Sequence, residues 1–415
     1  MSLNSVKPNK RKIINDPIYG FISIPYELVF DLIEHPWFQR LRRIRQLGLT
    51  SLVYPGALHT RFHHAIGAMY LSTLAVEELR NKGFEISKEE AEGVAVAVLL
   101  HDIGHGPFSH ALENSIVHNI SHEDVSLIFM EKLNEQFKGK LKIAIEIFVN
   151  SYPKKFLHQL VSSQLDMDRL DYLKRDSFYT GVSEGVISSD RIIKMLTIVN
   201  DELAVEEKGI YSVEKFIMAR RLMYWQVYLH KTVLSAENLL IKILSRAKEL
   251  AEKGERLFAT PAFKKFLYSK IDKSLLEKDN DTLENFAQLD DNDIYASIKV
   301  WQNHADQILS LLCKNLINRH LYKIEIAPVE YGKENVSTLL KKAAAKFEVT
   351  EKEASYFVFT GTVENKAYTI TTDSINILMK NGEVKDVANA SDHLNINALS
   401  ETVKKYFLCQ PKNLD

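Results

Sequence analysis

The sequence predicts a mainly α fold, an all-helical body followed by a smaller C-terminal α+β domain. Glycine and proline are scarce, 16 and 10 of the 415 residues, which is about half of their usual joint share and favours long helices over a turn-rich β fold. Residues 212–253 keep a helical pattern without either residue, and β-rich runs appear only after residue 320. We therefore expect a flexible tail over 1–11, a helical domain over 12–320 and an α+β domain over 321–415.

Three helices are expected in the first quarter of the chain. Residues 36–46 begin with a proline, which is favoured at the first helical position. Residues 61–80 repeat apolar side chains at helical spacing. Residues 87–102 open with Ser87 and Glu90, the spacing of a capping box, and continue through an almost wholly apolar stretch. A helix this apolar is buried, so it delivers the residues at its end to the interior of the protein.

Further helices and then strands follow along the chain. Residues 121–133 begin with a serine and, three residues later, an aspartate, which resembles another helix cap. The pattern of 212–253 would span roughly 60 Å as one helix. Near the C-terminus, Asn381-Gly382 between apolar segments is a strong hairpin signal. The expected strands are 321–328, 355–362, 367–371 and the pair within 375–387, and the helices expected beside them are 335–346 and 395–407.

The charge and cysteine content exclude several classes of protein. Lys and Arg number 53 against 54 Asp and Glu, so no global basic field gathers nucleic acid or an anionic membrane. The two cysteines, Cys313 and Cys409, cannot form a disulfide framework or a four-thiolate zinc site. No apolar run reaches the roughly 18–20 residues of a membrane span, and residues 1–12 lack the apolar stretch of a secretory signal. We expect a cytoplasmic protein with no membrane partner.

Histidines crowd one segment of the chain. Eight of the 14 histidines lie between residues 59 and 122, a concentration that indicates metal binding or acid–base chemistry. The string HDIGHGPFSH at 101–110 places three of them and an aspartate around a Gly-X-Gly-Pro turn. Glycines in such a turn let the backbone approach a ligand closely. A single buried histidine is more often an ordinary core residue, and only the ensemble of histidines and aspartate indicates metal binding.

A divalent metal site explains this ensemble. His101 and Asp102 bring an imidazole and a carboxylate to one point at the end of a helix, and these donors suit Mn, Fe, Mg, Ni or Zn. One of the two histidines at 63–64 can face inward, and Asp166 and Asp168 offer carboxylates. One upstream histidine, the His-Asp pair and one downstream aspartate make four ligands and leave positions for water, as in catalytic metal sites.

Eight motifs in this order resemble the HD-domain deoxynucleoside triphosphate triphosphohydrolases, the family of the vertebrate enzyme with a sterile alpha motif and of the bacterial dGTPases. The resemblance covers about residues 12 to 323 and implies an all-helical HD domain with a dNTP substrate. The motifs are INDPIYG (14–20), FQRLRRIRQLG (38–48), YPGALHTRFHHAIG (54–67), LLHDIGHGPFSH (99–110), SHED (121–124), LDMDRLDYLKRD (165–176), LHKT (229–232) and RHLYK (319–323).

The resemblance implies roles for individual residues. A phosphate would be held by Arg61, a guanidinium being well shaped for it, and by Arg169, which stands in place of a lysine. His105 would lie beside the attacking water and His110 near the leaving 5′ oxygen. His122 and Glu123 resemble a second catalytic pair of the bacterial members. The implied metal ligands are His64, His101, Asp102 and Asp168; the residues implied to meet phosphate and sugar are Tyr172 and Asp176, and those implied to enclose the deoxyribose are Gln46, Leu47 and Tyr228.

The chain also departs from the family pattern. Leu229 and Tyr224 replace a glutamine and a histidine of the vertebrate enzyme. At the family's activating nucleotide site Gln39 and Arg42 are kept, but Glu34 replaces an aspartate that reads guanine. The partners implied are a dNTP, an activating nucleotide and further copies of the chain in a dimer or tetramer.

The expected reaction is metal-dependent hydrolysis of a dNTP at the α-phosphate, which releases a deoxynucleoside and tripolyphosphate. One alternative keeps the HD metal site but takes nucleoside monophosphates or cyclic dinucleotides. Another is a non-catalytic regulator that binds nucleotides or single-stranded nucleic acid. The products distinguish dNTP hydrolysis from the first alternative, because only dNTP hydrolysis releases tripolyphosphate. Salt-sensitive retention of DNA without turnover would indicate the regulator.

Overall fold

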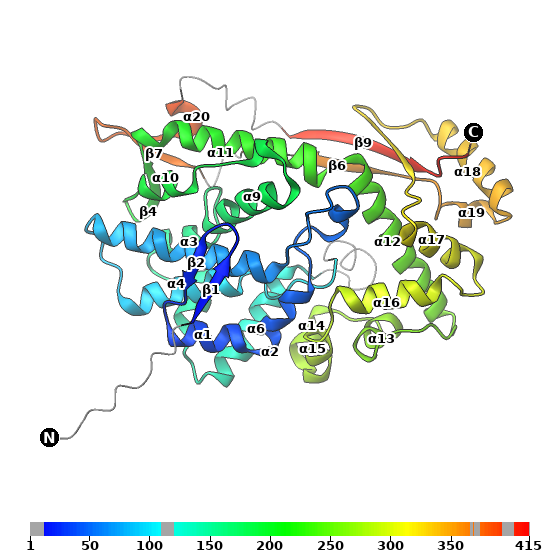
Figure 1. The fold of residues 1–415 in the computed structure, drawn as a ribbon, viewed down its shortest axis with the longest axis horizontal. Helices are drawn as coiled ribbons and strands as arrows, with labels where there is room; N and C mark the ends of the chain where they lie inside the picture. The colour runs from blue at the N-terminus through cyan, green and yellow to red at the C-terminus, as the bar shows by residue number, and fades with distance from the viewer. Residues whose placement is uncertain (1–11, 109–119, 366–367, 369–373, 392–401, 415) are drawn as a thin grey trace.

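The computed structural model describes residues 12–108, 120–365, 368, 374–391 and 402–414. These residues form mainly helices with small sheets, so the predicted fold class is confirmed (Figure 1). The predicted tail over 1–11 and the predicted proton donor His110 lie outside the described residues. None of the described helices is both long and apolar enough to cross a membrane.

The described chain begins with an antiparallel hairpin of β1 (Ile13–Asp16) and β2 (Gly20–Ser23), followed by α1 (Glu27–Glu34). The helix predicted over 36–46 ends early, as α2 (Pro36–Gln39) and a 3₁₀ turn over Arg40–Arg43. The cause is pairing with another segment: Gln46 N donates to the carbonyl of His59 at 3.0 Å, and Arg61 N donates to that of Ile44 at 2.9 Å. Ile44 is therefore extended, and Arg45 forms an isolated antiparallel bridge with Thr60.

The predicted helices around the histidine-rich segment are confirmed. They are α3 (Arg61–Asn81), α4 (Lys88–Leu100) and α6 (His122–Gln136). Ser87 and Glu90 form the predicted capping box, in which Ser87 N donates to Oε2 of Glu90 at 2.7 Å. Helix α3 packs against α4 and against α9 (Met167–Thr180). The other helices up to residue 194 are α7 (Lys142–Phe148), α8 (Lys155–Val161) and α10 (Ser189–Lys194), and short 3₁₀ turns cover Gly48–Leu52, Ser183–Gly185 and Glu207–Gly209.

The single long helix predicted over 212–253 is wrong. The segment forms α11 (Ile210–Met223), a π-helical turn over Tyr224–Tyr228 and α12 (Lys231–Glu252). No proline or glycine causes the break. Instead His230 is extended and its ring accepts a hydrogen bond from Thr232 N at 3.2 Å, which starts a new helix. The following helices are α13 (Pro261–Tyr268), α14 (Lys273–Lys278), α15 (Asn280–Phe286), α16 (Asp291–Trp301) and α17 (Gln307–Ile317).

The C-terminal region combines strands with short helices, as predicted. One antiparallel sheet has the order β5-β9-β6, and a four-stranded sheet has the order β3-β4-β7-β8, in which β4 and β7 are parallel. The second sheet takes strands from both sides of residue 320, so the domain boundary there stays a prediction. The bounds are β3 (Leu196–Val199), β4 (Glu202–Glu206), β5 (Lys323–Ala327), β6 (Phe359–Asn365), β7 (Asn376–Leu378), β8 (Val384–Asp386), β9 (Val403–Gln410), α18 (Lys333–Phe347), α19 (Glu351–Ala354) and α20 (Val387–Ala390).

The predictions for this region hold in part. The hairpin at 375–387 is confirmed, with Gly382 in its turn at a positive φ of 85°, and α18 matches the helix predicted over 335–346. The helix predicted over 395–407 is wrong from residue 403 onward, because that segment is the central strand β9, hydrogen-bonded on both edges. Of the run at 367–371, only Tyr368 is described.

Candidate metal centre

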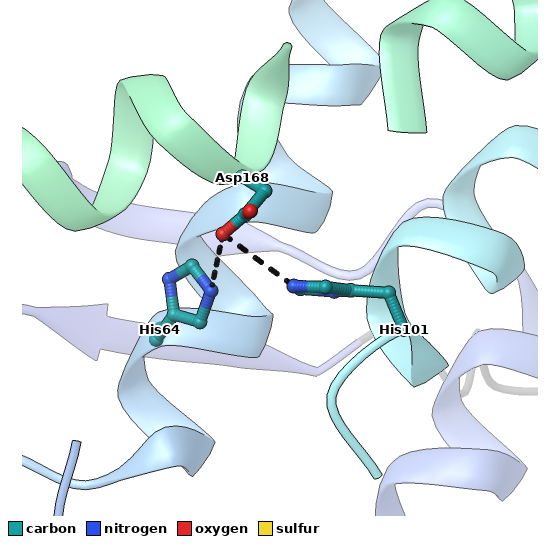
Figure 2. Close-up of side chains that lie close together, drawn as sticks. All are labelled: His64, His101 and Asp168. Carbon is teal, nitrogen blue, oxygen red and sulfur yellow. Dashed lines mark ion pairs between the residues drawn. The ribbon is translucent and has the colours of Figure 1, made fainter. Parts of the chain in front are cut away.

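Three helices bring the predicted metal ligands together. His64 lies in the first turn of α3, His101 and Asp102 follow the last turn of α4, and Asp168 lies in the first turn of α9. Figure 2 shows the side chains of His64, His101 and Asp168 converging on one point. The candidate ligand atoms of these three residues all lie within 4.8 Å of one another. Residues more than 100 positions apart thus meet where the apolar helix α4 ends.

The distances between these groups are short. Oδ1 of Asp168 lies 3.0 Å from Nε2 of His64 and 3.5 Å from Nε2 of His101. Asp102 contributes the second carboxylate, with Oδ1 3.3 Å from Nε2 of His101 and Oδ2 3.8 Å from Nε2 of His64. Two imidazole nitrogens and two carboxylates therefore surround one small volume.

Hydrogen bonds at the Nδ1 atoms of His64 and His101 fix the orientation of both rings, so that each Nε2 faces this volume. Nδ1 of His101 lies 2.6 Å from the carbonyl oxygen of Val98, and Nδ1 of His64 lies 2.8 Å from Oδ2 of Asp171. Both partners only accept, so both Nδ1 atoms carry hydrogen. Both Nε2 atoms are buried and point at Oδ1 of Asp168, 3.0 Å away for His64 and 3.5 Å away for His101. Imidazole nitrogens and carboxylates so arranged fit a divalent cation, which takes the place of the Nε2 protons.

Electrostatics at the site favour positive charge. Burial lowers the pKa of His64, but its hydrogen bonds and charge interactions with Asp168 and Asp171 outweigh burial and raise that pKa to about 10. For His101, Asp102 and Asp168 likewise outweigh burial and raise the pKa to about 9. The carboxylates thus create a strongly negative potential at the convergence point, which attracts a cation.

A second cluster adjoins the first through Asp102. Its Oδ1 lies 3.2 Å from Nε2 of His105, and the ring of His105 stacks on that of His122 with centroids 3.8 Å apart. Nε2 of His122 lies 3.2 Å from Oε1 of Glu123. Burial, and secondly the charge of Arg61, hold the pKa of His105 well below its usual value, so this imidazole is neutral.

The two arginines predicted to hold phosphate are both paired with carboxylates. Arg61 donates from Nη1 to Oδ2 of Asp102 at 2.6 Å, and Arg169 donates from Nη1 to Oδ2 of Asp166 at 3.2 Å. Asp166 also caps α9 by accepting from Arg169 N at 2.7 Å. The Nε atoms of both arginines are buried without a hydrogen-bond partner in the described part of the chain. Both guanidinium groups thus retain donors for a ligand.

A cavity of about 330 Å³ begins at Arg61 and contains the residues predicted to enclose a sugar, Gln46, Leu47 and Tyr228. The hydroxyl of Tyr228 donates to Oδ2 of Asp176 at 2.8 Å. The ring of Tyr172 lies between, 6.5 Å from the ring of His64 and 6.3 Å from that of Tyr228. The remaining wall includes Arg45, Gly48, Leu49, Thr50, Phe108, Tyr224, Leu229, Leu234, Glu237, Asn238, Leu240 and Ile241.

Four buried residues around the site were missed by sequence reasoning: Asp16, His59, Asp171 and Arg175. Nε2 of His59 lies 2.8 Å from Oδ1 of Asp176, so His59 holds the carboxylate that Tyr228 also binds. Asp171 and Arg175 stand at i and i+4 on α9, a spacing that identifies an ion pair in a helix. That spacing is the one local signal that could have found them.

Comparison with known proteins places these residues in a family. A model of the HD domain matches residues 61–176, and a model of the HD associated region matches residues 187–258. The chain is 34% identical over 412 residues to the uncharacterized protein YwfO of Bacillus subtilis, covering 94% of this chain and 90% of that protein. It is 31% identical over 264 residues to human deoxynucleoside triphosphate triphosphohydrolase SAMHD1, covering 53% of this chain and 42% of that protein.

Solved structures agree with the sequence comparison. A phosphohydrolase from Bacteroides thetaiotaomicron superimposes with a TM-score of 0.94 at 55% identity, covering 97% of this chain and 100% of that one. A hypothetical protein from Aquifex aeolicus gives a TM-score of 0.72 at 27% identity and 97% coverage of both chains. Because the converging histidines and aspartates all lie within the HD-domain match, the chain belongs to the HD-domain phosphohydrolases, the family to which the deoxynucleoside triphosphate triphosphohydrolases also belong.

Proposed function

We propose that this hydrolase cleaves deoxynucleoside triphosphates at the α-phosphate and releases a deoxynucleoside and tripolyphosphate. One observation carries the proposal: Arg61 lines the cavity that holds Gln46, Leu47 and Tyr228, and it also pairs with Asp102 in the histidine–aspartate cluster. A nucleoside in this cavity would present its 5′ phosphate to the cluster. The volume of about 330 Å³ lies within the range of small-molecule sites.

We assign one divalent cation to His64, His101, Asp102 and Asp168, because two inward-facing imidazole nitrogens beside two carboxylates fit such an ion. Manganese, iron, magnesium, nickel and zinc all accept this donor set. A bound cation of this kind supplies Lewis acidity toward a phosphoryl oxygen and lowers the pKa of water.

The protein's own residues provide the remaining chemistry. Arg61 and Arg169 retain buried donors that are available to a phosphate, and their charge would stabilise the negative charge that develops in the transition state. His105 is neutral, and its buried Nδ1 has no hydrogen-bond partner within the described residues, so it can accept a hydrogen bond from water and orient it. His122 and Glu123 would form a supporting pair behind it. The assignment of His110 as proton donor to the 5′ oxygen rests on the resemblance alone.

The sugar would be held in the cavity that Arg61 lines, on the side away from the histidine–aspartate cluster. Gln46 carries a buried Oε1 without a hydrogen-bond partner in the described chain, and this oxygen can accept from a sugar hydroxyl. Asp176 is held by His59 and Tyr228 on its two oxygens and keeps further lone pairs for a ligand. An activating nucleotide, assembly into dimers or tetramers and a cytoplasmic location stay predictions.

Product analysis tests the proposal. Purified protein is incubated with each dNTP and NTP, singly and mixed, in Mg²⁺ or Mn²⁺, and the products are identified by mass spectrometry. We expect tripolyphosphate and deoxynucleoside, and activity confined to mixtures would add nucleotide activation. Orthophosphate released from monophosphates instead would favour the first alternative. DNA retained in a salt-sensitive way without turnover under any metal would favour the regulator.

An Asp102→Asn variant assigns the activity to the cluster. It should lose the metal and nearly all turnover, because the amide cannot replace the anionic ligand. Asp306→Asn is the matched control: it also removes an arginine-bound carboxylate, which accepts from Arg246 at 2.6 Å and caps α17, but it lies outside the cluster. Wild-type turnover by Asp102→Asn would contradict the site assignment.

A further inference from the structure

The ring of His64 is held from the side that faces away from the candidate metal centre. Its Nδ1 donates to Oδ2 of Asp171 at 2.8 Å, and both side chains are fully buried. Its Nε2 is thereby turned toward Asp168 (Figure 2). A carboxylate behind a metal-binding imidazole fixes the orientation of the ring and raises its basicity toward the metal. The geometry of the centre therefore depends on what holds Asp171.

Asp171 is held by Arg175, one turn further along α9. Nε of Arg175 donates to Oδ2 and Nη2 donates to Oδ1, both at 2.9 Å, and the guanidinium is fully buried. Such a two-bond pair fixes both position and orientation of the carboxylate. The pair lies directly on α3: a Cβ at Gly67 would stand 2.1 Å from Oδ1 of Asp171 and 2.2 Å from Nη2 of Arg175. Only a glycine leaves this space one turn after His64.

Asp16, at the end of β1, is the second carboxylate that binds Arg175. Nη1 of Arg175 donates to Oδ2 of Asp16 at 2.8 Å. The other oxygen of Asp16 accepts from the backbone N–H groups of Ile18 and Tyr19, at 2.9 and 3.1 Å. The turn between β1 and β2 therefore fixes this carboxylate, which is 4% exposed. The contact joins two residues 159 positions apart.

We propose that Asp16 is a positioning residue for the metal centre, acting through Arg175 and Asp171 on His64. Arg175 is a buried cation between two carboxylates, and removing one partner of such a set leaves charge uncompensated and frees the side chain to move. The N-terminal hairpin, which holds the motif INDPIYG, thus orients a ligand of the centre without touching it. This inference rests on the proposed function only in requiring that His64 binds a cation.

Metal affinity tests the proposal directly. Mn²⁺ is titrated into metal-free wild type, Asp16→Asn and the control Asp306→Asn, and free Mn²⁺ is measured by electron paramagnetic resonance. An asparagine at position 16 keeps a single acceptor oxygen, so it cannot serve both Arg175 and the turn N–H groups. We expect the Kd for Mn²⁺ to rise about tenfold in Asp16→Asn, the scale known for partners behind a metal ligand, and to be unchanged in Asp306→Asn. Equal Kd values for Asp16→Asn and wild type would overturn the inference.

Two further measurements separate positioning from stability. The melting temperatures of metal-free Asp16→Asn and Asp306→Asn should both fall, because each variant loses an ion pair. The affinity for Mn²⁺ should fall only in Asp16→Asn. Should Asp16→Asn fail to fold, Arg175→Lys replaces it: the charge is kept, but one ammonium cannot make the two parallel bonds to Asp171, and we expect the same rise in Kd. If the wild type binds no Mn²⁺, the proposed metal centre is overturned as well. If the wild type, Asp16→Asn and Arg175→Lys all bind Mn²⁺ with equal Kd, only the role of Asp16 is overturned.

Discussion

Arg61 donates from Nη1 to Oδ2 of Asp102 at 2.6 Å, and both side chains are nearly buried. The sequence predicts a phosphate-binding role for the first residue and metal binding for the second, and the structure ties the two together. The guanidinium therefore neutralises part of the charge that Asp102 offers to a cation. A phosphate entering the cavity would compete with Asp102 for the same donors.

Replacing Arg61 should separate substrate turnover from metal binding. We expect Arg61→Gln to lower kcat/KM by about 10²–10³-fold, the cost of removing one charge-stabilising donor from a transition state. Mn²⁺ affinity should be equal or tighter, because Asp102 then has no competing cation. Steady-state kinetics and a Mn²⁺ titration measure the two effects, with Arg61→Lys as the variant that keeps the charge. A parallel loss of metal and activity in Arg61→Gln would contradict the phosphate assignment.

Arg169 offers a test of the resemblance at one residue. The resemblance implies a lysine at this position, so Arg169→Lys should retain most of the activity, since a point charge here still reaches a phosphate. Arg169→Ala should lose about 10²–10³-fold in kcat. Because Arg169 also pairs with Asp166, melting temperatures of both variants are compared with wild type. Equal activity of the alanine variant and wild type would remove Arg169 from the phosphate site.

Leu47 lines the cavity beside Gln46 and Gly48, and the resemblance implies that it encloses the deoxyribose; an apolar side chain packed on the sugar offers no partner to a 2′ hydroxyl. Leu47→Ala should raise kcat/KM for NTPs relative to dNTPs by about tenfold, since a few methylene groups in a pocket discriminate by about 1–3 kcal/mol. Leu229→Ala removes the same volume from the wall of the same cavity and should leave the ratio of NTP to dNTP rates unchanged. If both variants shift the ratio equally, general loosening of the cavity explains the effect.

Local sequence patterns predicted those parts of the fold that local interactions determine. The capping box of Ser87 and Glu90 spans three residues, so its spacing alone located the start of α4. The apolar run of α4 placed His101 and Asp102 correctly in the interior, at the point where His64 and Asp168 arrive. The residue pattern proposed the His-Asp pair with one upstream histidine and one downstream aspartate. The choice of His64 and Asp168 came from the resemblance, because no local pattern shows which side chains of separate helices converge.

Distant contacts explain what the sequence did not predict. The break at Tyr224–Tyr228 involves no helix-breaking residue; the hydroxyl of Tyr54 donates to the carbonyl of Gln226 at 2.5 Å from another segment. Strand β9 was predicted as a helix up to residue 407, and pairing with β5 and β6 on both edges overrides that pattern. Asp16 and Arg175 are too far apart in the chain for any periodicity to join them.

Gly67 should tolerate no side chain. A methyl group there would overlap the ion pair of Asp171 and Arg175 at 2.1 and 2.2 Å, so Gly67→Ala must displace a buried charge pair. We expect the free energy of unfolding to fall by about 3–5 kcal/mol, the cost of breaking such a pair, and Mn²⁺ affinity to fall with it. Chemical denaturation measures the first effect. Gly332→Ala, at a position with a φ of −60° and open space around the added Cβ, is the control without overlap and should cost at most about 1 kcal/mol, because alanine is a poorer N-cap of α18 than glycine.

Asp291 connects two walls of the substrate cavity and makes stability depend on pH. Its Oδ2 accepts from Arg45 N at 3.0 Å and its Oδ1 accepts from Phe108 N at 3.3 Å. Burial raises the pKa of this carboxyl to about 6, although both backbone hydrogen bonds lower it. Because the folded protein holds the proton more tightly than the unfolded chain, this contribution to stability is full below about pH 4 and is lost as the pH rises through 6.

The free energy of unfolding of wild type minus that of Asp291→Asn should therefore decrease by roughly 2–3 kcal/mol between pH 4 and pH 7, since one unit of pKa corresponds to about 1.4 kcal/mol. Urea denaturation at several pH values measures this difference, and the subtraction removes the other titrating groups. Asp306→Asn supplies a control of opposite sign: hydrogen bonds and charge from Arg246 outweigh burial and lower the pKa of Asp306, so its contribution is present above about pH 4 and is lost as the pH falls. A difference for Asp291 that stays flat would show that folding leaves the pKa of this carboxyl unchanged, and one that grows with pH would show that folding lowers it; either result would contradict the prediction.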